Sequence, residues 1–128
     1  MALYTLNAWL CSTDDEIGVQ HAEETDARPG EIQTVVKLAR KLWEQMCDPQ
    51  NPLKMVHDGY LKLFAMSKPQ LRYDIILLDE AQDTNPITLQ IVMSQVPRVA
   101  LVLVGDKHQS IYGFRKACLL YTSDAADE

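Results

Sequence analysis

Two polar segments in the second half of the chain carry side chains that can act on a phosphate anhydride. Asp79 and Glu80 follow one apolar run, and Gln109 follows another. A carboxylate at the end of a strand can hold Mg²⁺ through water, and its neighbour can deprotonate an attacking water. A neutral amide can position that water or sense a terminal phosphate. Taken alone, an adjacent acidic pair is more often a solvated strand end.

Two aromatic rings and a cation lie just beyond this amide. They are Tyr112, Phe114 and Arg115. Aromatic rings combined with an arginine can stack on the bases of a single-stranded nucleic acid. The same rings could equally be core residues, so the pattern by itself leaves stacking and packing open.

A parallel sheet would bring the two polar segments together. The apolar runs predict strands near 74–79 and 100–104, both buried on two faces. Between them, Asn85 as N-cap and Pro86 as first residue predict a helix over 86–96. Its expected apolar stripe consists of Leu89, Val92, Met93 and Val96. A strand–helix–strand unit of this kind has a right-handed crossover and binds ligands at the carboxyl ends of its strands. The polar segments are therefore expected at one edge.

The two segments also resemble motifs of a known family. The run Asp79-Glu80-Ala81-Gln82-Asp83 resembles motif II of the UvrD/Rep-type superfamily 1 DNA helicases, and residues 104–115 resemble their motif III. Residues 57–63 resemble the segment before motif II in the branch that includes the F-box DNA helicase. The resemblance covers about residues 5–117. In one departure, Lys116 stands where the family usually has glycine.

The resemblance implies an α/β fold, a partial RecA-like (P-loop NTPase) domain with parallel strands that follows a mainly helical segment. It also implies ATP and Mg²⁺ as cofactors. Asp79 would coordinate Mg²⁺, Glu80 would be the catalytic base, and Gln109 would contact the γ-phosphate or its attacking water. Tyr112, Phe114 and Arg115 would contact single-stranded DNA. The implied activity is ATP-driven 3′–5′ translocation on single strands and the unwinding of duplex DNA at junctions.

Three segments follow from this interpretation. Residues 1–55 are expected to be part of an inserted helical subdomain, and 56–117 part of the first RecA-like ATP-binding domain. Residues 118–128 do not continue the family pattern and look like a translated sequencing adapter, although a divergent native tail is the alternative.

The first segment shows helical periodicity. Helices are predicted over 1–11, over 31–47 and from Asp58 onward. The residues expected to face inward are Leu3, Leu6 and Leu10 in the first helix, Ile32, Val35, Val36, Ala39, Leu42, Trp43 and Met46 in the second, and Tyr60, Leu61 and Phe64 in the third. Lys37, Arg40 and Lys41 lie off the stripe, on a face that is either solvated or in contact with a DNA backbone.

Composition narrows the class of protein. The 128 residues carry a net charge of −6, which argues against a generic nucleic-acid-binding surface but not against a local one. The three cysteines lack metal-ligand spacing, and no signal peptide or membrane-spanning run is visible, so we expect an intracellular protein with reduced thiols. Its compartment would be the cytoplasm in a bacterium and the nucleus in a eukaryote.

Two other functions remain open from the sequence. One is the helicase part of a helicase–nuclease, whose motifs II and III look similar. The other is a non-catalytic RecA-like interaction module, against which the intact Asp79, Glu80 and Gln109 argue. No Gly-x-x-x-x-Gly-Lys-Ser/Thr phosphate loop occurs in the 128 residues, so the isolated chain is expected to be inactive.

Overall fold

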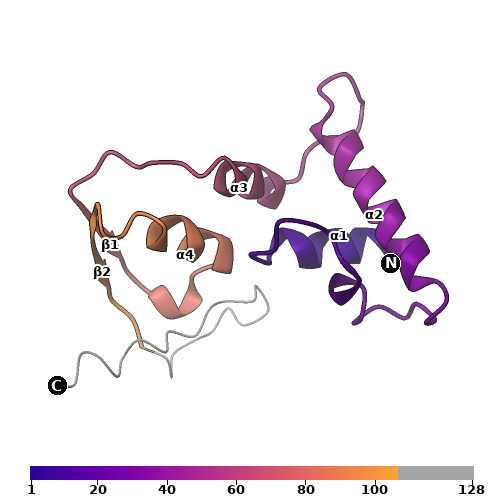
Figure 1. Cartoon of the computed structure of the whole chain (residues 1–128), viewed down its shortest axis with the longest axis horizontal. Helices are drawn as coiled ribbons and strands as arrows, with labels where there is room; N and C mark the ends of the chain where they lie inside the picture. The colour runs from indigo at the N-terminus through magenta and orange to yellow at the C-terminus, as the bar shows by residue number, and fades with distance from the viewer. Residues whose placement is uncertain (107–128) are drawn as a thin grey trace. The chain divides into compact units, whose positions relative to one another are not determined.

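The structure is a computed structural model that describes residues 1–106 of the chain. The chain divides into two compact units, Met1–Met66 and Ser67–Glu128 (Figure 1). The described part of the first unit is helical, and that of the second contains a parallel sheet. The fold is therefore α/β, as predicted. Within residues 1–106, no helix has the length and apolar character that crossing a membrane requires.

The first unit is built on three α-helices. They are α1 (Ala2–Leu10), α2 (Ile32–Cys47) and α3 (His57–Met66), with the short 3-10 helix η1 (Val19–His21) between the first two. Helix α1 packs against α2, where Ala39 is fully buried and its small side chain allows a close approach. The buried core is continuous and consists of Leu6, Trp9, Leu10, Ile17, Ala22, Val35, Val36, Ala39 and Met46. The predicted helices over 1–11 and 31–47 are confirmed.

The inward face of α3 differs from the prediction. Tyr60 is 62% exposed and Phe64 is 46% exposed, whereas Gly59 and Lys62 are buried. The Lys62 ammonium explains the difference, because it donates to the carbonyl oxygens of Ser12 at 2.8 Å and Asp14 at 2.6 Å. These bonds turn the Gly59–Lys62 side of the helix inward. In α1, Leu6 and Leu10 are buried as predicted, whereas Leu3 is 53% exposed. Trp9, which was not among the predicted inward residues, is 1% exposed.

Lys62 also completes an aromatic cluster. Its Nζ lies 4.5 Å from the centroid of the Trp9 ring, and Trp9 meets Trp43 edge to face with centroids 5.0 Å apart. Burial lowers the pKa of the Lys62 ammonium, although the nearby Asp14 and Asp15 carboxylates act in the opposite direction. The lysine is a structural element that joins α3 to the segment after α1.

Replacing Lys62 by methionine should destabilise the first unit. The change keeps an unbranched apolar stem but leaves the Ser12 and Asp14 carbonyls without their donor, which should lower the free energy of unfolding by about 1–3 kcal/mol. Urea denaturation followed by tryptophan fluorescence measures the change. Lys37→Met on the exposed face of α2 is the control, and equal effects of the two variants would contradict this role for Lys62.

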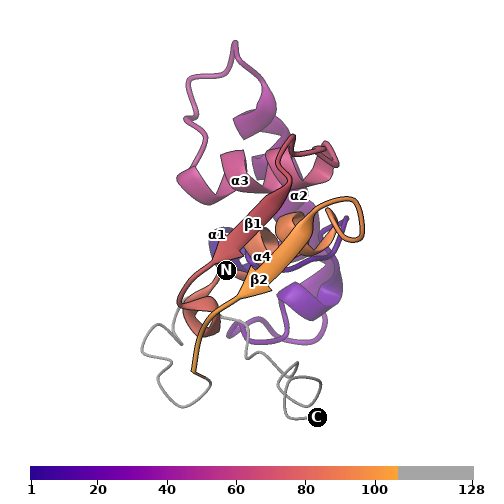
Figure 2. The same cartoon turned by 90° about the vertical axis from the view of Figure 1, so that its left-hand side faces the viewer.

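The second unit contains the predicted strand–helix–strand segment. Strand β1 (Ile75–Leu78) pairs in parallel with β2 (Ala100–Leu103), with Ile75 opposite Ala100 and Leu78 opposite Leu103 (Figure 2). The connection holds the 3-10 helix η2 (Ala81–Asp83) and α4 (Pro86–Met93). Asn85 caps α4, because its Oδ1 accepts a hydrogen bond from the Ile87 amide at 2.8 Å, and Pro86 is the first helical residue. The parallel pairing and the cap are confirmed, but α4 ends at Met93 rather than at residue 96.

The burial of this segment differs from the prediction. Each strand alternates between exposed and half-buried residues, and Leu77 is 73% exposed. The expectation of strands buried on both faces is therefore wrong for the described residues, which supply only one crossover helix to a sheet that needs helices on two faces. In α4 the buried residues are Ile87, Ile91 and Val92, so Met93 and Val96 of the expected stripe are exposed.

Candidate functional site

The carboxyl ends of the two strands are tied together by backbone hydrogen bonds. The Val104 amide donates to the Leu78 carbonyl at 2.8 Å, and the Ala81 amide donates to the Val104 carbonyl at 2.9 Å. The pairing thus continues past both strands into the acidic segment. It places Asp79 and Glu80 beside the segment that enters Gly105 and Asp106. This is the edge at which parallel sheets bind ligands.

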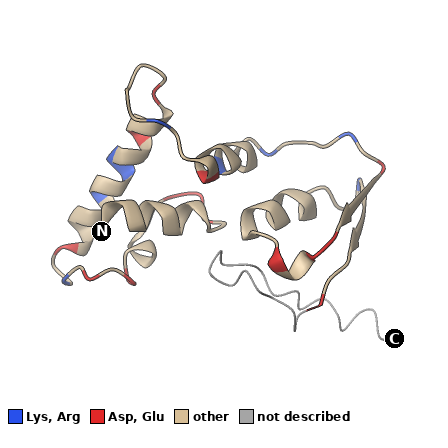
Figure 3. Cartoon of the chain, turned by 180° about the vertical axis from the view of Figure 1, so that it is seen from behind, with Lys and Arg blue, Asp and Glu red and all other residues tan. Residues whose placement is uncertain are grey.

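The acidic pair is exposed at this edge. Figure 3 shows acidic residues where β1 ends. Asp79 and Glu80 have no ion pair with a lysine or arginine within residues 1–106, and Asp79 Oδ1 accepts the Glu80 amide at 2.8 Å. Two exposed carboxylates that form no ion pair with the described lysines and arginines are suitable for a hard divalent cation.

The backbone at Glu80 is held in an unusual conformation. Its φ of 49° and ψ of 41° are left-handed, a region that costs a non-glycine residue roughly 1–2 kcal/mol. The turn is fixed by η2, in which the Asp83 amide donates to the Glu80 carbonyl at 2.9 Å. Strained backbone of this kind is concentrated at functional sites, because the surrounding structure must hold it in place.

The other predicted site residues lie outside the described part of the chain. They are Gln109, the proposed phosphate sensor, and Tyr112, Phe114 and Arg115, the proposed DNA contacts. Their roles stay predictions. Asp79 and Glu80 are the predicted site residues that the structure does place, and both lie at the edge of the sheet where β1 ends.

Gln82 is a residue of this site that the sequence reasoning missed. Its side chain is 1% exposed, its Nε2 donates to Glu80 Oε2, and its Oε1 accepts the Asp106 amide at 2.9 Å. The signal was a polar residue inside the acidic motif, directly after the fully buried Ala81. Gly105 lies against it, and a Cβ there would come within 3.0 Å of the Ala81 nitrogen and 3.2 Å of the Gln82 nitrogen.

A metal site made wholly of protein ligands is not found in residues 1–106, which hold no group of three or more His, Cys, Asp or Glu side chains placed to share an ion. Mg²⁺ does not require such a group. It usually keeps several waters and is held by one or two carboxylates together with the phosphates of its substrate. Asp79 and Glu80 fit that kind of site by their chemistry and exposure.

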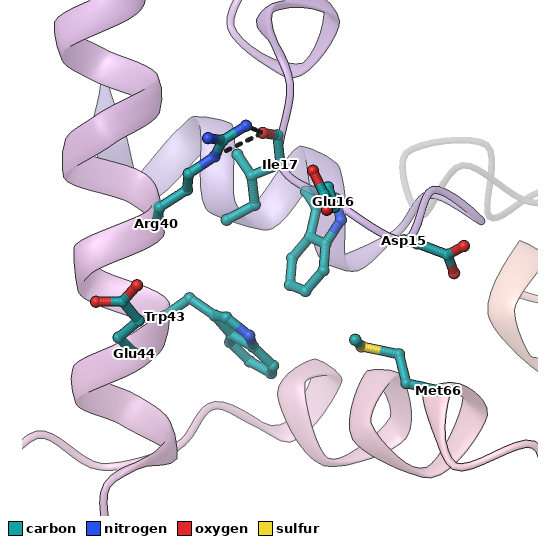
Figure 4. Close-up of a pocket in the computed structure, with 8 residues that line it drawn as sticks. Asp15, Glu16, Ile17, Arg40, Trp43, Glu44 and Met66 are labelled. Carbon is teal, nitrogen blue, oxygen red and sulfur yellow. Dashed lines mark hydrogen bonds between the residues drawn. The ribbon is translucent and has the colours of Figure 1, made fainter.

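A separate pocket of about 280 Å³ lies in the first unit (Figure 4). Trp43 and Met66 contribute apolar surface, and the lining also includes the acidic residues Asp15, Glu16 and Glu44. Arg40 is not available there, since its Nε and Nη2 donate to the Ile17 carbonyl at 3.0 and 2.6 Å. An acidic lining is unsuitable for phosphate, and the Arg40 bonds join α2 to the segment before η1.

Comparison with known proteins decides the family. Residues 17–127 match the model of the UvrD/REP helicase N-terminal domain. The chain belongs to this family. The resemblance stated from motifs II and III is thereby confirmed.

Known proteins match this chain over different shares of its length. F-box DNA helicase 1 of Gallus gallus is 41% identical in an alignment that covers 92% of the chain and 13% of the relative. F-box DNA helicase protein 1 of Schizosaccharomyces pombe is 34% identical over 90% of the chain and 14% of the relative. The RecBCD enzyme subunit RecB of Escherichia coli is 37% identical in an alignment that covers 44% of the chain and 5% of the relative. No solved structure shows a significant match.

The chain thus spans about one seventh of the length of the F-box helicase relatives that it matches over most of its own length. The two F-box relatives are DNA helicases by name. What the whole protein acts on, and with which cofactors, is the subject of the proposal below.

Proposed function

We propose that the chain is part of an ATP-dependent DNA helicase that couples ATP hydrolysis to 3′–5′ translocation on single-stranded DNA and to duplex unwinding. One observation carries the proposal. In a chain of the UvrD/REP family, the exposed carboxylates of Asp79 and Glu80 follow a parallel strand at its carboxyl end, beside Gly105 and Asp106. The domain is proposed to be RecA-like, with residues 1–55 in a helical insertion, 56–117 in the ATP-binding domain, and 118–128 as a non-native tail.

The proposed chemistry at this edge is hydrolysis of the terminal phosphoanhydride of ATP. Asp79 would hold Mg²⁺ through its carboxylate, and Mg²⁺ would neutralise charge that develops on the phosphates. Glu80 would accept the proton of the attacking water, and Gln109 would position that water or contact the γ-phosphate. The exposure of both carboxylates and the absence of an ion pair to either within residues 1–106 support these roles.

The proposed DNA contacts come from the next part of the sequence. Tyr112 and Phe114 would stack on bases of single-stranded DNA, and Arg115 would add a positive charge. In the whole protein, duplex junctions would be the second substrate. Because the substrate would be DNA, the proposal places the protein inside the cell, in the nucleus if the source is a eukaryote like the chicken and fission yeast relatives.

The helicase–nuclease alternative has less support. The RecB relative of Escherichia coli matches 44% of the chain, whereas the two F-box helicases match 90% or more. A non-catalytic module would have no need of Asp79 and Glu80 as an exposed pair, and the ATPase measurement below separates it from the helicase.

ATP hydrolysis measured on two proteins tests the proposal. The full-length protein should hydrolyse ATP only with Mg²⁺, and single-stranded DNA should stimulate the rate. The isolated 128-residue chain should show no measurable turnover, because it lacks a phosphate-loop sequence to supply the lysine and backbone donors for the β- and γ-phosphates. A full-length protein with no DNA-stimulated hydrolysis would contradict the helicase proposal, and DNA-stimulated turnover by the isolated chain would contradict the need for that loop.

A further inference from the structure

We propose that Gln82 is a positioning residue that couples the orientation of the Glu80 carboxylate to the backbone at Asp106. The proposal rests on the function proposed above, in which Glu80 is the catalytic base. Its basis is one buried amide with two partners. Nε2 donates to Glu80 Oε2, and Oε1 accepts the Asp106 amide at 2.9 Å, so a single side chain joins the segments that follow the two strands.

The amide group is chemically specific for this position. One end must donate to a carboxylate and the other must accept from an N–H, and a primary amide supplies both at once. A carboxylate in its place would keep the acceptor for Asp106 but would present a second negative charge to Glu80. An apolar side chain of the same size would keep neither bond. Since Gln82 is 1% exposed, water does not readily replace a bond that is lost.

The surroundings prevent the amide from moving independently. Ala81 is fully buried, and its amide is bonded to the Val104 carbonyl at 2.9 Å. Gly105 lies so close that a Cβ at this position would meet the Gln82 side chain and two backbone nitrogens. A shift of the backbone at Asp106 would therefore displace the Gln82 amide, and with it the hydrogen bond that orients Glu80.

This geometry gives DNA a route to the catalytic base. Asp106 comes shortly before Gln109 in the sequence, at the start of the run that carries the proposed DNA contacts Tyr112, Phe114 and Arg115. Any shift of the Asp106 backbone that accompanies DNA binding would reach the Glu80 carboxylate through the two hydrogen bonds of Gln82.

The same unit offers a matched control. Gln95 is also buried, at 3% exposed, and its Nε2 donates to the Pro69 carbonyl at 3.0 Å and the Ile91 carbonyl at 2.8 Å. Its Oε1 accepts the Leu71 amide at 2.9 Å. These partners precede β1 and belong to α4, so Gln95 fixes the fold at the other end of the strands. The two glutamines share residue type and burial but differ in their link to Glu80.

The experiment compares Gln82→Leu, Gln95→Leu and Glu80→Gln in the full-length protein. For each variant it measures the ATPase rate with and without single-stranded DNA, the KM for ATP, the DNA affinity and the melting temperature. Gln82→Leu should lower the DNA-stimulated kcat by about 10- to 100-fold, because a misplaced catalytic group loses rate without losing binding. Its KM and DNA affinity should stay close to those of the parent. Gln95→Leu should lower the melting temperature to a similar extent and leave kcat unchanged.

Two results would overturn the inference. One is a parental kcat in Gln82→Leu. The other is a loss of kcat in Gln95→Leu equal to that in Gln82→Leu, which would mean that Gln82 acts only by stabilising the fold. If Gln82→Leu yields no soluble protein, Gln82→Glu decides: it keeps the acceptor for Asp106, and we expect it to lose kcat because it repels Glu80. A parental rate in Gln82→Glu would refute the proposal. Unchanged hydrolysis in Glu80→Gln would instead refute the proposed role of Glu80 itself.

Discussion

Glu80→Gln should abolish ATP hydrolysis by the full-length protein while its affinity for single-stranded DNA stays nearly the same. The substitution keeps the size and shape of the side chain and removes its basicity. A positioned general base contributes about 10²–10⁴-fold to the rate, so a loss of that order is expected in kcat. Because Glu80 is exposed, the change should leave the fold intact; within residues 1–106 its carboxylate accepts one side-chain bond, from Gln82.

The measurement is a pair of titrations, one of ATPase rate and one of binding to labelled single-stranded DNA. Glu23→Gln, which neutralises an exposed carboxylate in the first unit, serves as the control and should behave like the parent. Hydrolysis at the parental rate in Glu80→Gln would show that another group activates the water. A loss of DNA binding in the same variant would show that Glu80 supports the DNA site as well.

Removing one of the two predicted stacking rings should weaken DNA binding and spare basal ATP hydrolysis, the reverse of the effects expected for Glu80→Gln. Tyr112→Ala or Phe114→Ala in the full-length protein should weaken binding of single-stranded DNA by about 1–3 kcal/mol for each lost stack. Basal, DNA-independent hydrolysis should survive, because an aromatic ring offers a face to a base but no group to the phosphates. The stimulation of hydrolysis by DNA should fall with the affinity. The same paired titrations measure both effects.

The control for the rings is Tyr73→Ala, since this tyrosine is 65% exposed and precedes β1 at the other end of the strands. It should bind DNA like the parent. If both ring variants unfold and leave no soluble protein, the rings are core residues. If they fold and bind DNA with parental affinity, the stacking role belongs to other side chains.

Local signals made the supporting frame predictable. The apolar runs around 75–78 and 100–103 specify strands, and Asn85 with Pro86 specifies the start of α4, because each signal acts through its own backbone or its immediate neighbours. The parallel pairing could be predicted because a helix that connects two strands is typical of a parallel pair. The acidic pair could be placed at the sheet edge for the same reason.

Features that depend on partners distant in sequence could not be predicted. Lys62 faces inward because it reaches the Ser12 and Asp14 carbonyls, and no periodicity in α3 encodes those acceptors. The role of Gln82 depends on the Asp106 amide, which the fold brings to it from beyond β2. The left-handed backbone of Glu80 was equally invisible, since glutamate has no preference for that conformation.

One side of the two-stranded sheet is exposed in the described part of the chain, which bears on whether the second unit can fold alone. Ile75, Leu77, Val102 and Val104 are between 46% and 73% exposed, and burying a side chain of this kind fully is worth about 1.5–3 kcal/mol. The free energy that this face would gain on being covered is comparable to the whole stability of a small domain. The stability of the second unit therefore depends on burial of this face of β1 and β2 as much as on its own hydrogen bonds.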